Sequence, residues 1–266
     1  MTSPLGARIV AFLGLSALAF LVLPLLIVVP MSFSSARALA FPPPGFSLRW
    51  YESFFGDPRW MEALWNSLSI ALISSIFATI LGGLGAYGLR RGTFRARDVV
   101  ESNFMAPLIV PTIIAAVAMY LAFAKTNLLG TFLGLVIAHT VLSVPLVMMV
   151  LGVAIRSFDV RIEQVGWSLG GSWFYTARTV LLPNIAPSLF AAWIFAFIGS
   201  FDEVIVTSFI GGAYETIPKK MFNELILEVN PTITAVATLL MAFTILALGA
   251  SAWMLRRAGK LRETML

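Results

Sequence analysis

Six long runs of apolar residues divide the chain, and short polar connections separate them. A bilayer core about 30 Å thick requires about 20 apolar residues in a helix, and each run is long enough. Backbone groups in lipid must be paired within their own segment, so continuous runs of this kind predict helices. The pattern therefore predicts an all-α integral membrane protein with about six transmembrane helices, over residues 9–31, 63–89, 104–124, 128–155, 185–210 and 231–255.

Lys and Arg are distributed unevenly between the two alternate sets of connections, and the cytoplasmic set is normally the richer one. The richer set contains Arg8, Arg90, Arg91, Arg95, Arg97, Arg156, Arg161, Arg178, Arg256, Arg257, Lys260 and Arg262. The poorer set contains Arg37, Arg49, Arg59, Lys125, Lys219 and Lys220. This distribution predicts that both termini are cytoplasmic, in agreement with an even number of spans.

The composition supports a membrane protein. Hydrophobic residues make up 59% of the 266 residues and charged residues only 12%, about half the charged fraction of a soluble domain. So few charges cannot cover a water-soluble surface, and the excess apolar surface must face lipid. The longest polar connection has about thirty residues, too few for an independent core. We therefore expect a single transmembrane domain over residues 1–266, and the long first run favours a membrane helix over a cleaved signal peptide.

The cytoplasmic connection of residues 156–184 has the most distinctive polar pattern. Asp159 and Ser172 are suited to cap two short helices. Gly170 can end the first of them, because glycine tolerates the left-handed backbone that follows a helix. We expect Pro183 to limit the second helix. The pattern predicts two short surface helices that meet at a glycine corner.

The first of these short helices offers a small apolar surface. That surface consists of Val165, Gly166 and Leu169, with Glu163, Gln164 and Trp167 beside it. A short exposed helix of this kind suits docking into a groove on another protein. The alternative is an inert linker, since amphipathic loop helices are common in membrane proteins.

The spacing within this connection resembles the EAA motif of binding-protein-dependent ABC import permeases. That motif reads E-A-A, three residues, G, nine residues, then I-x-L-P. The corresponding residues here are Gln164, Val165, Gly166, Gly170, Val180, Leu181, Leu182 and Pro183. The spacing fits throughout, whereas the identities depart at the E-A-A triplet. The preceding Glu163 could supply the carboxylate instead.

The resemblance extends along most of the chain. The stretches WNSLSIALISSIFATILGGLGAYGLRR and IGSFDEVIVTSFIGGAYETIPKKMF look most like the second permease of spermidine/putrescine importers. The resemblance implies the type I ABC importer permease fold, a bacterial inner-membrane location and one permease domain that forms half of the solute pathway. It also implies contact with the ATPase through Glu163, Gln164, Val165, Gly166, Leu169, Gly170, Leu182 and Pro183.

The implied partners are two ATPase subunits, a second permease that is expected to be a different chain, and a soluble substrate-binding protein. The implied solute is a polyamine or a similar small cationic organic solute. Permeases for an amino-acid derivative, a metal ion or an anion remain alternatives. A secondary transporter without ATPase partners is a further alternative, although it predicts internal repeats or broken helices at the midplane.

Ionisable residues at membrane depth are costly and are candidates for function. Asp202 and Glu203 are the acidic pair within the fifth run, and Thr207 and Ser208 follow them. One interpretation is that these four residues line the substrate pathway and attract a cation. The other is that the acidic pair caps or pairs locally. His139, the single histidine, is more often hydrogen-bonded between helices than part of a proton relay.

Catalytic motifs are absent from the sequence. It contains no G-x-x-x-x-G-K-[ST] loop, no H-E-x-x-H and no G-x-S-x-G, so we expect neither ATP hydrolysis nor other catalysis by this chain. We expect no cofactor and no metal site in it. The net charge of +5 is read as topology bias and not as a nucleic-acid footprint.

Overall fold

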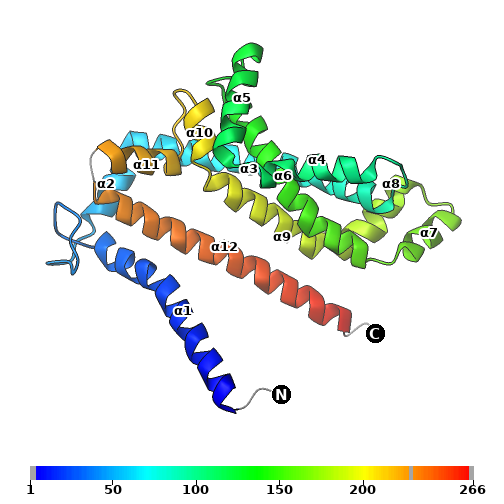
Figure 1. Ribbon diagram of the computed structural model, residues 1–266, viewed down its shortest axis with the longest axis horizontal. Coiled ribbons are helices and arrows are strands. Elements are labelled where there is room, and N and C mark those ends of the chain that lie inside the picture. The colour runs from blue at the N-terminus through cyan, green and yellow to red at the C-terminus, as the bar shows by residue number, and fades with distance from the viewer. Residues whose placement is uncertain (1–3, 228–229, 264–266) are drawn as a thin grey trace. The chain divides into compact units, whose positions relative to one another are not determined.

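The computed structural model (Figure 1) describes residues 4–227 and 230–263, and its regular structure within these ranges is helical apart from one isolated β-bridge. The helices are α1 (Pro4–Ser32), α2 (Arg49–Gly56), α3 (Pro58–Arg91), α4 (Arg97–Ile109), α5 (Thr112–Thr126), α6 (Phe132–Ser157), α7 (Val160–Ser168), α8 (Trp173–Thr176), the π-helical segment η1 (Ala177–Leu181), α9 (Leu182–Phe201), α10 (Ile205–Ile210), α11 (Ile217–Leu227) and α12 (Thr232–Glu263).

The first of two compact units comprises residues 1–61 and 221–243. Side chains of α2 hold the loop that follows α1: Trp50 Nε1 donates to the Ser34 carbonyl at 2.9 Å, and Arg49 Nη2 donates to the Ala36 carbonyl at 2.9 Å. Trp60 is buried against Phe54. No residue in the most apolar part of α1 is buried, so its side chains are available to lipid or to another chain.

The second unit comprises residues 62–220 and 244–266, and α6 is its central helix. Val147 and Leu151 of α6 pack with Ile185 and Ala192 of α9 in the main apolar cluster. Gly82 allows α3 to approach α6 closely, because a Cβ atom there would lie 2.8 Å from Val147 Cγ1. Small residues at helix crossings serve this purpose in membrane proteins.

The third predicted span, over residues 104–124, is not one straight helix. The helix pair α4 and α5 bends by 106° at Val110 and Pro111. Pro111 lacks an N–H group and forces the preceding residue out of the helical region, and Val110 is extended, with ψ 130°. The described residues therefore contain five helices long and apolar enough to cross a membrane, or six if the bent pair is one span.

The fifth predicted span, over residues 185–210, also differs from the structure. The chain is helical without interruption from Trp173 to Phe201, so Pro183 does not limit the second short helix. Pro183 lies just after the π-helical segment η1, where the ordinary α-helical hydrogen-bond pattern is already interrupted, so its missing N–H group is accommodated inside the continuous helix. At the other end α9 stops at Phe201, and the short helix α10 begins only at Ile205.

Candidate functional site

The connection between α6 and α9 folds into two short helices that meet at a corner beyond the end of α6 (Figure 1). Both predicted caps are confirmed: the Asp159 carboxylate accepts from the Arg161 amide, and the Ser172 hydroxyl accepts from the Tyr175 amide. Gly170 has φ +86°, the left-handed conformation that glycine tolerates best. The corner is therefore set by local sequence.

The outer face of α7 carries exposed side chains. Val165 is 57% exposed and Leu169 is 83% exposed, and Gln164 is exposed as well. One isopropyl and one isobutyl group exposed to water at the tip of a short helix form a small apolar surface that another protein can cover. These three residues are called the α7 tip below.

The inner face of α7 is fastened to the end of α3 by Glu163. This carboxylate is 2% exposed and accepts from Arg91 Nη2 at 2.7 Å and Nε at 3.0 Å, and from the Tyr87 hydroxyl at 2.9 Å. Arg91 Nη2 also donates to the Phe158 carbonyl at 3.0 Å. These contacts of Glu163, Arg91 and Tyr87 are called the Glu163 anchor. The interpretation that Glu163 supplies a carboxylate to a partner is corrected here, because both of its oxygens are bonded within the chain.

Gly166 does not lie on the outer surface either. It is half-buried, and a Cβ atom there would lie 3.0 Å from Thr176 Cγ2. The Gly171 amide donates to the Gly166 carbonyl at 3.0 Å and closes the corner. Gly166 is thus required for the close approach of α7 and α8.

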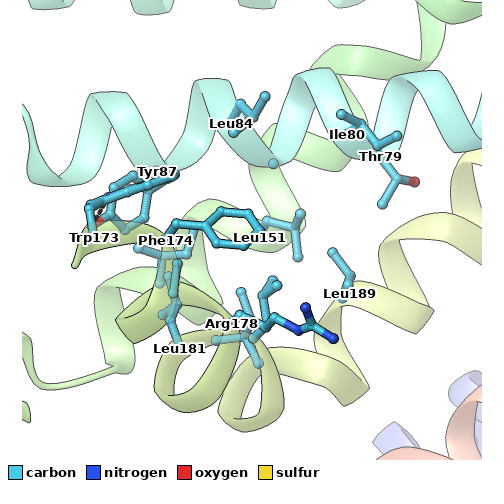
Figure 2. Close-up of a pocket in the computed structure, with 15 residues that line it drawn as sticks. Thr79, Ile80, Leu84, Tyr87, Leu151, Trp173, Phe174, Arg178, Leu181 and Leu189 are labelled. Carbon is cyan, nitrogen blue, oxygen red and sulfur yellow. Dashed lines mark hydrogen bonds between the residues drawn. The ribbon is translucent and has the colours of Figure 1, made fainter. Parts of the chain in front are cut away.

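Leu182 borders an apolar groove of about 640 Å³ that α3, α6 and the η1–α9 segment form together (Figure 2). At one end of it, Trp173 Nε1 donates to the Tyr87 hydroxyl at 3.0 Å. Arg178 is the one charged residue among those that line the groove. An apolar wall with a single positive charge does not suit a cationic solute. None of the four predicted pathway residues lies in this groove.

The predicted pathway residues separate into two kinds. Glu203 caps α10, accepting from the Val206 and Thr207 amides at 2.7 and 2.8 Å and from the Thr207 hydroxyl at 3.1 Å. Thr207 is fully buried. Asp202 and Ser208 are exposed, and the Ser208 hydroxyl donates to the Val204 carbonyl of its own helix. The break between α9 and α10 therefore has a bonded inner side and an exposed outer side.

His139 of α6 connects this break to α3 and α9. Its Nδ1 lies 2.8 Å from Ser200 Oγ and its Nε2 lies 3.0 Å from Thr207 Oγ1, while Ser200 Oγ lies 2.9 Å from Ser74 Oγ. Because Thr207 donates to Glu203, it accepts from Nε2, which leaves Nδ1 to accept from Ser200. The prediction that His139 is hydrogen-bonded between helices is confirmed.

Two residues of the Glu163 anchor were missed as site residues in the sequence. Arg91 counted only toward the cytoplasmic charge, and Tyr87 of the second run had no assigned role. Their partner lies 72 and 76 residues away, so no local pattern links them. The available signal was the pair Arg90–Arg91 at the end of an uncharged run, facing a connection that contains a carboxylate.

Residues 78–260, well over half of the chain, match the family described as "Binding-protein-dependent transport system inner membrane component". The chain belongs to this family. It is a multi-pass inner-membrane permease of a binding-protein-dependent ABC importer, a transport component and not an enzyme. Permeases of this class assemble with an ATPase and a binding protein.

The permease is similar to curated transport proteins of Escherichia coli strain K12. It is 30% identical over 234 residues to the spermidine/putrescine transport system permease protein PotC, with 88% of each chain covered. It is 32% identical over 252 residues to the putrescine transport system permease protein PotI, covering 91% of this chain and 89% of the relative.

The permease fold also appears in a crystal structure of a bacterial ABC transporter involved in the import of the acidic polysaccharide alginate. The TM-score is 0.69 at 16% identity, and the match covers 97% of this chain and 98% of that chain. At this level of identity the likeness concerns the fold alone.

Proposed function

We propose that this permease imports a polyamine or a similar small cationic organic solute. The observation that carries the proposal is the similarity to PotC and PotI, each at about 30% identity over about nine-tenths of the chain. The alternatives are an amino-acid derivative, a metal ion or an anion. The groove beside Arg178 argues against binding of a cation there, so the proposed route is a different surface.

The solute is tested with the assembled complex, its binding protein and a panel of ligands. Because a loaded binding protein stimulates ATP hydrolysis in a coupled importer, spermidine and putrescine should give the largest stimulation. Amino acids, divalent metal ions and oxyanions serve as the comparison ligands. Stimulation by one of these and none by polyamines would overturn the polyamine assignment and leave the importer assignment intact.

The pathway is proposed to run between this chain and a second permease, a different chain, with two ATPase subunits and a soluble binding protein completing the assembly. Both termini are cytoplasmic, and residues 1–266 form one permease domain. Asp202 and Ser208, which are exposed at the α9–α10 break, line the route. Glu203 and Thr207 support the break from inside.

The α7 tip is proposed to dock into a groove of the ATPase. What supports this is the division of α7 into an exposed apolar side, led by Leu169, and a buried side fastened through Glu163. An element of this kind can receive force on one face and pass it on through the other. Gly170, Leu182 and Pro183 shape and continue the connection and do not themselves form the docking surface.

Leu169→Asp tests this docking surface. The substitution places a charge in an apolar contact, which costs several-fold or more in affinity. We expect the ATPase to be lost during purification in mild detergent, while the permease still inserts. Leu227→Asp is the matched control, because Leu227 is 82% exposed on α11 and lies outside the connection. Equal ATPase recovery from both variants would reject docking at the α7 tip.

A further inference from the structure

We infer that the Glu163 anchor makes the end of α3 and the coupling connection move as one body, so that ATPase-driven displacement passes directly into α3. This inference rests on the proposed docking of α7. It assigns Arg91, Glu163 and Tyr87 as positioning residues for coupling. Covalent continuity joins the connection only to α6 and α9, and apart from the anchor α3 follows these helices through apolar packing, which fixes position less strictly than the bonds of a buried ion pair.

The attachment is made at several points on the last turns of α3. Arg91 reaches Glu163 of α7 and the Phe158 carbonyl just before α7, and Tyr87 reaches Glu163 and Trp173 of α8. Two donors of the Arg91 guanidinium share one oxygen of Glu163 and the Tyr87 hydroxyl donates to the other, so charge-assisted bonds hold both oxygens of the carboxylate. Both short helices are therefore held by residues four positions apart on α3.

The burial of the anchor makes separation unfavourable. The side chains of Glu163 and Arg91 are 2% and 16% exposed. If α7 moved away from α3, the carboxylate would lose its partner while it is still screened from water, which is costly for a buried ion. The neighbouring pair Arg90–Glu101 joins α3 to α4 with side chains that are 28% and 32% exposed. The stronger link thus leads to the coupling connection.

Displacement of α3 has a consequence at the groove. The α3 residues Thr79, Ile80, Gly83, Leu84 and Tyr87 form one wall of it, and residues of η1 and α9 form another. Side chains from both walls face each other across the groove (Figure 2). An α3 that moves with the connection keeps these walls in register. If α3 were detached, the two walls of the groove would slide past each other. The displacement driven by the ATPase would then be lost within the permease.

The direct test measures a distance during the ATPase cycle. The sequence has no Cys, so Gly88→Cys on α3 and Arg161→Cys on α7 give this chain a unique pair of spin-label sites. Position 88 is open, with no atom within 4 Å of a Cβ there. In the assembled complex, we expect the same 88–161 distance distribution with and without bound nucleotide. A nucleotide-dependent shift of the main distance would overturn the inference.

The functional test compares Glu163→Gln with Glu101→Gln in reconstituted importer. Glu163→Gln should lower the amount of solute imported per ATP hydrolysed several-fold and make the 88–161 distance depend on nucleotide. Glu101→Gln removes an ion pair of the same kind from the adjacent arginine and should change neither. Unaltered coupling in Glu163→Gln would also overturn the inference.

The two proposals fail in different ways. An ATPase that never co-purifies with the wild-type permease would reject the docking proposal itself. An ATPase that co-purifies while the 88–161 distance changes in the spin-labelled permease with Glu163 intact would reject only the anchor. Because the wild-type distance measurement leaves the anchor intact, poor folding of Glu163→Gln does not remove the test.

Discussion

Two polar side chains in the apolar part of this permease, Glu203 and His139, have their hydrogen bonds satisfied within the chain. Glu203 stands at the break between two helices, and the free amides of α10 and the Thr207 hydroxyl satisfy its carboxylate. His139 uses both ring nitrogens on hydroxyl groups of Ser200 and Thr207. A buried polar group without partners is costly. These residues therefore stabilise the α9–α10 break, and their polar atoms are already bonded within the chain.

Removal of the imidazole should destabilise the break. In His139→Leu the hydroxyls of Ser200 and Thr207 each lose one of two partners, because Ser74 and Glu203 still bond them, and each lost hydrogen bond should cost about 0.5–1.5 kcal/mol. We expect a lower thermal unfolding midpoint in detergent. Ser208→Ala is the control, since that exposed hydroxyl bonds only within α10. Equal midpoints for both variants would show that the His139 contacts contribute little.

The exposed carboxylate beside this break has a different expected effect. Asp202→Asn removes one negative charge from the proposed route and should reduce uptake of a cationic solute by several-fold, without lowering the unfolding midpoint. The measurement is initial uptake into proteoliposomes at low salt and at high salt. Because screening weakens attraction between exposed charges, the difference from wild type should shrink at high salt. Unchanged uptake and substrate choice would assign Asp202 a structural role.

Helices in this chain begin and end where local chemistry requires. Pro111 bends α4 against α5, and Asp159 and Ser172 start the two short helices. Gly170 turns the corner between these helices with φ +86°. Because the corner orients the α7 tip, a change in the φ angle of Gly170 would reorient the proposed docking surface.

The same substitution at two glycines should therefore have opposite effects. Gly170→Ala imposes a side chain on a left-handed residue and should cost about 1 kcal/mol. Gly88→Ala lies in the interior of α3 with open space around it, and should be neutral or stabilising by up to about 1 kcal/mol. Thermal unfolding and uptake are measured for both. If Gly170→Ala matched Gly88→Ala in both measurements, the corner would not depend on glycine.

At the scale of the whole molecule, the permease presents much of its apolar surface outward. No residue in the most apolar part of α1 is buried, and only 22% of the most apolar part of the Thr232–Trp253 segment is. Exposed apolar area of this extent has to be covered by lipid or by other subunits. The family membership and the proposed second permease account for such surfaces.

The predicted orientation can be tested with single cysteines, again because the natural chain has none. Arg37→Cys should react with a membrane-impermeant thiol reagent in intact spheroplasts. Arg8→Cys and Arg95→Cys should react only after permeabilisation, since the distribution of Lys and Arg predicts a cytoplasmic position for both. All three residues are exposed in the structure. The reverse labelling pattern would invert the assigned topology.

The sequence by itself determined those features that depend on neighbours along the chain. Runs of about 20 apolar residues specify spanning helices wherever a bilayer is the solvent. The capping residues and Gly170 act within a few positions, so the short helices of the connection were predictable. The resemblance to the EAA motif identified the family for the same reason, since it is a pattern of local spacing.

Only the tertiary structure decided which distant groups meet. Glu163 was an equally good candidate for a partner contact until folding brought Arg91 and Tyr87 to it from more than 70 positions away. Gly166 was read as surface, and its place against Thr176 depends on how α7 folds back on α8. Pairings of this kind depend on packing between helices, and hydropathy cannot encode them because it describes each residue without its spatial neighbours.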